Sequence, residues 1–236
     1  MRFDVITIFP KFFERFANEA LIARAQKKKL IVIKTHNLRD FASDKRGTVD
    51  DRPYGGGAGM ILMAEPIAKA VQSVTLRRFA PQGNKGRKRR RPLLKVIVFS
   101  AKGKKFTQAT ARRWAKLDQL IMICGRYEGI DERVVRHVAD EEISIGEYVL
   151  FGGEVPATVV MEAVTRLVPG AIGKQESLRE ESFADAGFLE YPHYTRPEKL
   201  AIQGKTTRVP QVLLSGDHRK IEAWRKKHAR LSTRNH

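Results

Sequence analysis

The alternation of short apolar runs with helical stretches in the middle of the chain limits the possible folds more than any other feature of the sequence. Strands are predicted at residues 96–100 and 120–124, with a helix at 107–117 between them. A further apolar-polar run around Ile143 and Ile145 precedes a helix predicted at 155–167. This order is typical of a mostly parallel sheet covered by helices, so the sequence predicts an α/β fold.

Glycines follow each of these predicted strands. Gly103 follows the first strand and Gly125 the second, while Gly146, Gly152 and Gly153 follow the run around residue 143. Any one of them could serve only to make a turn, but their recurrence after successive strands favours a shared role. Because ligands bind beyond the carboxyl ends of parallel strands, we expect three glycine-bearing loops to converge on one ligand.

Two more strands are predicted near the N-terminus, at residues 3–8 and 31–33, and the helix between them has Asn18 as a candidate N-cap. Residues 37–59 are polar and glycine-rich, and loops of this length are usually functional or disordered. A helix is predicted again at residues 64–76. Together with the central elements, these segments form a first domain predicted to span residues 1–169.

The rest of the chain is predicted to form a linker and a second, smaller domain. Residues 170–187 are polar and lack a clear period, which is typical of a flexible linker. Residues 188–236 are predicted to form a small helical domain, in which Asp217 caps a helix that turns Ile221 and Trp224 inward.

The chain carries 45 Lys and Arg residues against 26 Asp and Glu residues, a net charge of +19. An excess of this size favours a polyanionic partner, and nucleic acid is the first candidate. An anionic membrane is disfavoured because the sequence has no long apolar span and no basic amphipathic helix with a bulky aromatic face. The single cysteine, Cys124, rules out an intrachain disulfide, and we expect a soluble, cytosolic protein.

One basic block is concentrated at residues 85–91, where only Gly86 is uncharged. It is equally well interpreted as a solvated insertion and as an arm that contacts phosphates. Three other local patterns do not complete the motifs that they resemble. The glycines at 55–59 do not complete a dinucleotide-binding fingerprint, residues 204–206 do not complete a P-loop, and the histidines and the cysteine lack zinc-site spacing. We predict no structural metal.

Four segments occur in an order that matches one protein family. They are residues 50–60 (DDRPYGGGAGM), 124–133 (CGRYEGIDER), 144–154 (SIGEYVLFGGE) and 192–197 (PHYTRP). Together they resemble the bacterial tRNA (guanine-37-N1)-methyltransferase family, and the similarity runs from residue 1 to about residue 224. The resemblance implies a SPOUT-type sheet with a deep trefoil knot, a small α-helical C-terminal domain that binds tRNA, and an obligate homodimer.

The resemblance also implies S-adenosylmethionine as the methyl donor, bound in the knot loops. Glycines there allow the main chain to approach the adenine edge, while Tyr148, Leu150 and Pro156 supply apolar walls. By motif match, the donor-binding residues are Ser100, Ala101, Gly103, Gly125, Tyr127, Glu128, Gly129, Ile145, Gly146, Glu147, Tyr148, Val149, Leu150, Gly152, Gly153 and Pro156.

The implied chemistry needs a base and a cation, because guanine N1 must lose a proton while negative charge grows on O6. By motif match the base is Glu181, where the family usually has Asp, and the cation is Arg166. Each has an ordinary alternative. Arg166 stands four residues after Glu162, the spacing of a surface ion pair, and most carboxylates in a polar linker are simply solvated.

For the substrate, the resemblance assigns tRNA contacts to Asp50, Arg52, Tyr54, Gly59, Glu128 and His193, with a magnesium ion near Glu128. Carboxylates suit the N–H donors on the Watson–Crick edge of a flipped guanine. The alternatives are an internally paired surface turn at residues 50–52 and a packed loop histidine at 193.

The resemblance thus implies methyl transfer from S-adenosylmethionine to N1 of guanosine 37 in tRNA, next to the anticodon, in support of reading-frame maintenance. Two other functions remain open: a knotted methyltransferase acting on another RNA, and a non-enzymatic RNA-binding protein. The positions of Glu181 and Asp50 favour methylation of guanine N1 in tRNA over a knotted methyltransferase that acts on another RNA. The non-enzymatic RNA-binding protein should not bind S-adenosylmethionine, so a binding measurement distinguishes it.

Overall fold

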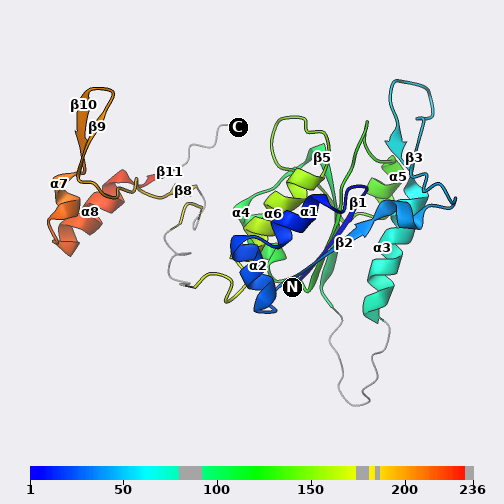
Figure 1. Cartoon of the computed structure of the whole chain (residues 1–236), viewed down its shortest axis with the longest axis horizontal. Helices are drawn as coiled ribbons and strands as arrows, with labels where there is room; N and C mark the ends of the chain where they lie inside the picture. Colours follow the sequence, from blue (N-terminus) through cyan, green and yellow to red (C-terminus); the bar gives the residue numbers. More distant parts are fainter. Residues whose placement is uncertain (80–91, 174–180, 184–186, 232–236) are drawn as a thin grey trace, which may run out of the picture. The chain divides into compact units, whose positions relative to one another are not determined.

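The computed structural model describes residues 1–79, 92–173, 181–183 and 187–231 (Figure 1). The chain divides into two compact units, Met1–Gly173 and Lys174–His236. The basic block at residues 85–91 lies outside the described residues. Within the described ranges, no helix combines the length and the apolar character needed to cross a membrane.

The first unit is built on a five-stranded sheet with the order β2-β1-β6-β5-β7, in which every neighbouring pair is parallel. The prediction of a mostly parallel α/β sheet is therefore confirmed. The strands are β1 (Arg2–Thr7), β2 (Val32–Asn37), β5 (Leu94–Lys105), β6 (Gln119–Ile123) and β7 (Glu141–Ser144).

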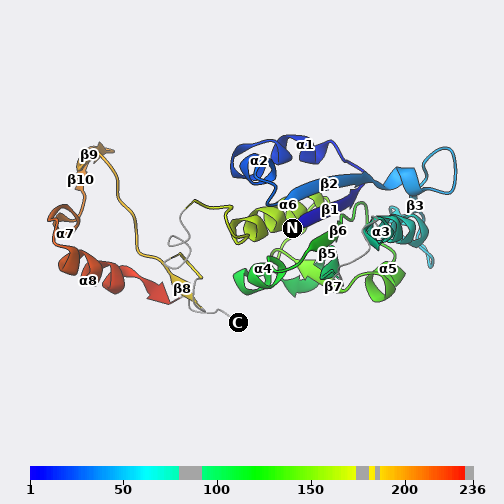
Figure 2. The same cartoon turned by 90° about the horizontal axis from the view of Figure 1, so that it is seen from below.

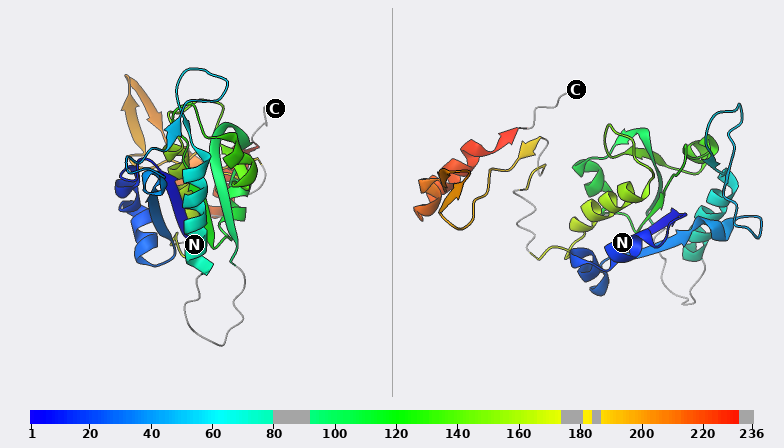
Figure 3. Two further views of the ribbon diagram at one scale, coloured as in Figure 1. Left: turned by 90° about the vertical axis from the view of Figure 1, so that its right-hand side faces the viewer. Right: turned by 45° about the horizontal axis from the view of Figure 1, so that its top comes forward.

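Helices cover both faces of this sheet. On one side lie α1 (Phe12–Ala17), α2 (Ala20–Lys27), α4 (Gln108–Trp114) and α6 (Glu154–Arg166), and on the other α3 (Ala64–Phe79) and α5 (Glu132–His137). Figure 2 shows the first group to the left of the sheet and the second to the right, and Figure 3 gives two further views. A hydrophobic core lies on each face of the sheet, and β6 contributes to both. Leu120 and Met122 face the first group of helices, while Ile121 and Ile123 face the second.

Strand β5 is longer than the predicted residues 96–100, because it continues past a break in its pairing with β7. The register shifts between Phe99 and Lys104, so that both residues pair with Ile143. Gly103 lies at this break, where an added Cβ would be 2.5 Å from the Ile143 backbone nitrogen. Only glycine fits where two backbones approach so closely.

The predicted helix between the first two strands is wrong in one respect, since two helices occur there. Asn18 follows the last turn of α1 and donates from Nδ2 to the carbonyl of Glu14 at 2.8 Å, whereas α2 begins after Glu19. The expected loop at residues 37–59 contains a short 3-10 helix, η1 (Leu38–Phe41), and β3 (Asp50–Asp51). Strand β3 pairs antiparallel with β4 (Ile61–Leu62).

The second unit mixes helices with short antiparallel pairs, so the expected α-helical domain is an incomplete description. It contains β8 (Phe188–Leu189), β9 (Lys199–Ile202), β10 (Lys205–Arg208), α7 (Gln211–Leu214), α8 (His218–His228) and β11 (Arg230–Leu231). The predicted cap is confirmed, because the Asp217 carboxylate accepts hydrogen bonds from the amides of Arg219 and Lys220. Trp224 stacks on His228 with 4.1 Å between ring centroids.

Candidate donor-binding site

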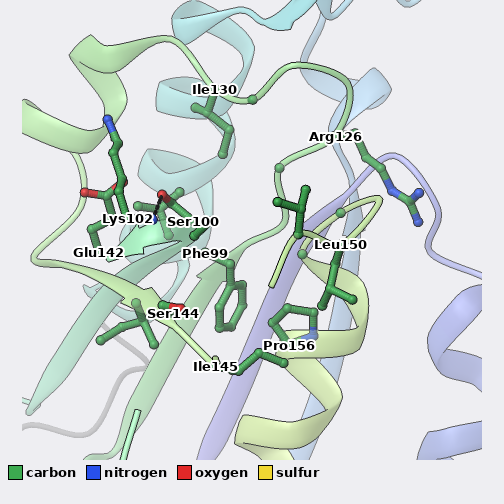
Figure 4. A pocket seen from close by; sticks show the side chains of 18 of the residues that line it. Phe99, Ser100, Lys102, Arg126, Ile130, Glu142, Ser144, Ile145, Leu150 and Pro156 are labelled. Carbon is green, nitrogen blue, oxygen red and sulfur yellow. Dashed lines mark hydrogen bonds and ion pairs between the residues drawn. The ribbon is translucent and has the colours of Figure 1, made fainter. Parts of the chain in front are cut away.

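A cavity of about 480 Å³ opens beyond the ends of β6 and β7, beside the register break in β5 (Figure 4). Three stretches of chain form most of its walls: residues 98–102 of β5, residues 125–130 after β6, and residues 142–146 and 148–153 from β7 to the start of α6. Two of the three glycine-bearing loops expected to converge, those after β6 and β7, do meet here, whereas the β5 stretch contributes no glycine. They meet because parallel strands all deliver their carboxyl ends to the same edge of the sheet.

Most residues predicted to bind the donor line this cavity. They are Ser100, Ala101, Gly125, Tyr127, Glu128, Gly129, Ile145, Gly146, Tyr148, Val149, Leu150, Gly152, Gly153 and Pro156. Two others lie elsewhere. Gly103 packs against the backbone of β7, and the exposed Glu147 carboxylate pairs with Lys105 Nζ at 3.3 Å.

Hydrogen bonds between main-chain atoms hold the loops together. The Gly153 amide donates to the Gly125 carbonyl at 2.9 Å, and Arg126 and Gly152 form an isolated antiparallel bridge. Tyr127 adopts a positive φ of 60° and Gly129 one of 131°, which turns the chain back after β6. The cavity is thus shaped by fixed main-chain geometry, with main-chain groups of the glycines close to the space that a ligand would fill.

The third loop is shaped by its own hydrogen bonds. The Ser144 hydroxyl donates to the Gly146 carbonyl at 2.9 Å and accepts from the Gly146 amide at 3.2 Å. The Tyr148 hydroxyl donates to the Ile145 carbonyl at 3.2 Å, which folds the ring back over Gly146. A Cβ at 146 would meet that ring, so a larger residue there would displace the exposed Tyr148 side chain.

Charged side chains give the cavity an acidic character at one side. Glu128, Glu132 and Glu142 line it together with Lys102, whose Nζ lies 3.0 Å from Glu132 and 4.0 Å from Glu142. The hydrogen bond to Glu132 raises the pKa of Lys102, and the same bond lowers the pKa of Glu132. The Oε1 atom of Glu142 is buried without a hydrogen-bond partner among the described residues. These carboxylates favour a cationic ligand.

The buried cysteine does not contribute a nucleophile. Burial raises the pKa of Cys124 well above its ordinary value, with a smaller contribution from Glu154. The thiol therefore stays protonated at neutral pH, and the thiolate is the reactive form. The chemistry of this cavity does not depend on Cys124.

The loop predicted to meet the substrate adjoins the cavity. Strand β4 is tied to the second cavity loop, because the Leu62 amide donates to the Gly129 carbonyl and the Glu128 amide to the Met60 carbonyl, both at 3.0 Å. Gly59 has a φ of 85°, and a Cβ there would lie 2.7 Å from Glu128 Oε1. The chain segment carrying Asp50, Arg52 and Gly59 thus reaches Glu128, while the Tyr54 side chain is fully exposed.

The remaining predicted residue of the first unit, Arg166, does not line this cavity. Arg166 ends α6 and lines a separate cavity of about 250 Å³ with Glu162 and Thr165. It lies ten positions after Pro156, or about 15 Å along the helix. Glu181 and His193 belong to the second unit, where His193 Nε2 lies 3.3 Å from Glu190 Oε2. Their roles stay predictions.

Two residues at the cavity were missed by sequence reasoning. Arg126 and Glu154 form an ion pair of 2.9 Å, and Glu154 is only 1% exposed. Both lie inside the segments used for the family resemblance, but their pairing depends on tertiary contacts. No group of three or more His, Cys, Asp or Glu residues suited to a metal occurs in the part of the chain that the structure describes.

Known proteins of one family are similar to this chain along nearly its whole length. The sequence model of the family described as tRNA (Guanine-1)-methyltransferase TrmD matches residues 1–236. A relative from Carboxydothermus hydrogenoformans is 46% identical over 233 residues, covering 99% of this chain and 84% of the relative. A relative from Dictyoglomus turgidum is 47% identical over 233 residues, covering 99% and 86%. One from Geobacter sp. (strain M21) is 45% identical over 227 residues, covering 96% and 84%. All three carry the name tRNA (guanine-N(1)-)-methyltransferase.

Proposed function

The chain belongs to the tRNA (guanine-1)-methyltransferase family, and on this premise we propose that it transfers a methyl group from S-adenosylmethionine to N1 of guanosine 37 in tRNA. Methylation beside the anticodon would support maintenance of the reading frame. The observation that carries this proposal is the convergence of two motif-bearing loops, after β6 and β7, with residues 98–102 of β5 on one cavity.

The cavity fits the donor in size and chemistry. Its volume of about 480 Å³ is within the range of small-molecule sites. Ile145, Leu150 and Pro156 offer apolar walls for the adenosine, and the glycines leave main-chain groups open to its polar edge. When bound, S-adenosylmethionine supplies an electrophilic methyl group on a positively charged sulfur, which the carboxylates of Glu128 and Glu142 suit.

In this proposal Glu181 removes the N1 proton of guanine and Arg166 stabilises the charge that develops on O6. Arg166 does not line the donor cavity of its own chain. A homodimer provides a second Arg166 for each cavity, so the proposed chemistry and the proposed assembly support each other.

Exposed apolar side chains near the cavity support a homodimer. Val149 is 88% exposed and Phe151 is 93% exposed, and both lie in the loop between β7 and α6. Val155 and Val159 are also exposed, on one face at the start of α6. Contiguous apolar surface on a protein commonly marks an interface with another chain. Sedimentation analysis tests this assembly, and a monomer at working concentration would contradict it.

We assign the tRNA contacts to the loop with Asp50, Arg52, Tyr54 and Gly59, to Glu128 and to His193. The net charge of +19 supports a polyanionic substrate. Magnesium commonly uses one or two carboxylates together with waters and substrate oxygens, so a lone Glu128 beside the substrate suits it. In the second unit, the basic last turn of α8 supports a tRNA-binding role.

We also propose that the sheet of the first unit carries a deep trefoil knot. The register break at Gly103 and the bond between Gly153 and Gly125 support loops that pass close to one another. We keep domains at residues 1–169 and 188–236 with a flexible linker between them, and the division of the chain at Gly173 supports this linker. A cytoplasmic location suits a tRNA substrate and a single unpaired cysteine.

The decisive experiment is incubation of the purified protein with labelled S-adenosylmethionine and an unmodified tRNA transcript that has guanosine at position 37. Nucleoside analysis should find the label in 1-methylguanosine. A matched transcript with adenosine at position 37 should take up none. Label in another nucleoside would point to a different substrate, and calorimetry without donor binding would favour a non-enzymatic RNA-binding protein.

A further inference from the structure

A buried carboxylate that the proposed chemistry does not use lies directly behind the donor cavity. Glu154 begins α6 and is 1% exposed. Its Oε1 accepts a hydrogen bond from the Thr7 hydroxyl at 2.7 Å, and its Oε2 accepts one from Arg126 Nε at 2.9 Å. Because a buried carboxylate is costly unless it is paired and hydrogen-bonded, this arrangement needs both partners.

Arg126 connects two of the cavity loops through this carboxylate. Its own loop, residues 125–130, lines the cavity, while its side chain extends away from Ser100 and Ile145 in Figure 4. The Nη1 atom donates to the Phe151 carbonyl at 3.4 Å, and the guanidinium lies over the Phe9 ring at 4.7 Å. One side chain thus touches the loop after β6, the loop before α6 and the segment after β1.

Gly152 packs closely against this ion pair. A Cβ on Gly152 would lie 2.5 Å from Arg126 Cδ and 2.8 Å from Glu154 Oε2. The Thr7 hydroxyl also accepts a hydrogen bond from the Phe9 amide at 2.9 Å, which fixes the hydroxyl that contacts Glu154. The position of the third cavity loop is therefore set by the ion pair beneath it.

We propose that Arg126 and Glu154, oriented by Thr7, are positioning residues that hold the loops 125–130 and 150–153 at the separation that S-adenosylmethionine requires. This inference rests on the proposed function, because it takes the cavity to be the donor site. Neither side chain takes part in proton removal or in charge stabilisation on the base. Without the ion pair, donor binding must also order the loops, and the free energy of that ordering weakens the affinity.

The expected kinetic effect follows from this role. Variants that lose the ion pair should raise KM for the donor while kcat at saturating donor stays near its wild-type value, because binding is weakened equally in the ground state and the transition state. General destabilisation of the fold would instead reduce the active fraction and lower kcat. The split between KM and kcat separates positioning from a merely structural role.

Four variants test the proposal by calorimetric titration with S-adenosylmethionine. Arg126→Gln and Glu154→Gln should each weaken binding by about tenfold, which corresponds to about 1.4 kcal/mol. The double variant should lose no more affinity than the single variant that binds the donor less tightly, because both changes remove the same interaction. Arg126→Lys should recover part of the loss, since its amine reaches Glu154 but cannot bridge to the Phe151 carbonyl as well.

The matched control is Asp4→Asn in β1, the strand that also carries Thr7. Asp4 is also fully buried and hydrogen-bonded by Arg2, His36 and Gln119, but it does not line the donor cavity. This variant should unfold at a lower temperature and still bind the donor as the wild type does. An equal loss of affinity in Asp4→Asn would overturn the proposal, as would additive losses in the double variant.

Donor binding by the wild type and by Arg126→Gln separates failure of the positioning role from failure of the proposed function. If the wild type binds S-adenosylmethionine and Arg126→Gln binds it equally well, the positioning role is wrong and the proposed function stands. If the wild type itself does not bind, the proposed function is wrong and the positioning role falls with it. Should Arg126→Gln not fold because it leaves the buried Glu154 carboxylate without its counter-charge, Glu154→Gln still decides the question, since it removes the buried charge and the remaining Arg126 side chain is 24% exposed.

Discussion

Gly103→Ala should separate β5 from β7 at the register break. An added Cβ would lie 2.5 Å from the Ile143 nitrogen, 2.6 Å from the Glu142 carbonyl carbon and 2.7 Å from the Ile143 carbonyl carbon. All three are backbone atoms, so no side-chain rotation relieves the clash. Overpacking of this kind costs about 1–3 kcal/mol. At about 2–4 °C per kcal/mol for a chain of this size, Tm should fall by about 2–12 °C.

The assay is thermal unfolding followed by far-UV circular dichroism, with donor affinity measured on the same samples. Gly173→Ala is the matched control, because its Cβ would have no heavy atom within 4 Å and its backbone conformation suits an ordinary residue. The control should melt with the wild type. Gly103→Ala should also bind the donor more weakly, since Ala101 and Lys102 line the cavity just before it. Equal melting temperatures for both variants would refute the steric reasoning.

Three further predictions concern charge. Burial opposes ionisation of Asp4, but hydrogen bonds from His36, Arg2 and Gln119 outweigh it and hold the pKa of this carboxyl below its ordinary value. The stability that ionised Asp4 contributes is therefore fully present above about pH 4 and is lost as the pH falls through the lower pKa of the folded state. In denaturant titrations, Asp4→Asn should lose less stability on acidification than the wild type. Equal losses would contradict this. Glu181→Gln should abolish tRNA methylation while leaving calorimetric donor binding nearly intact, and unchanged turnover would remove Glu181 from the mechanism. Neutralising the charges at residues 85–91 should weaken tRNA binding and flatten its salt dependence through lost counterion release, whereas an unaltered salt slope would make the block a bystander.

Elements with strong apolar periodicity were predictable from the sequence. The strand predicted at residues 120–124 is β6 (Gln119–Ile123), and the helix predicted at 155–167 is α6 (Glu154–Arg166). Helix α5 (Glu132–His137) was missed because Val134 is its only fully buried residue, so the stretch has no apolar stripe. Its start depends instead on the Asp131 carboxylate, which accepts a hydrogen bond from the Arg133 amide.

The hairpin of β9 and β10 was missed for a related reason. Every residue of both strands is exposed, so neither strand shows the alternation that marks a half-buried sheet. The turn does leave a local signal, because Gln203 and Gly204 both adopt positive φ, at 50° and 74°. A glycine there is suited to a tight hairpin turn, and that signal was available in the sequence.

Part of the candidate site was also predictable from the sequence and part was not. Glycines after β6 and β7 predicted two of the converging loops, since parallel strands share an edge wherever they lie in the order. The ion pair of Arg126 and Glu154 was not predictable, because it joins residues 28 positions apart through the packing of two loops. Gly103 follows a predicted strand as the cavity glycines do, yet it supports the sheet and does not line the cavity.

The place of β1 between β2 and β6 has a consequence for synthesis of the chain. Strand β2 follows closely in sequence, but the other partner of β1 begins only at Gln119. Until the ribosome has released that segment, one edge of an apolar strand stays unpaired, and such edges recruit other chains. Nascent or truncated products that stop before β6 are therefore expected to aggregate, so the first third of the protein depends on the middle for its solubility.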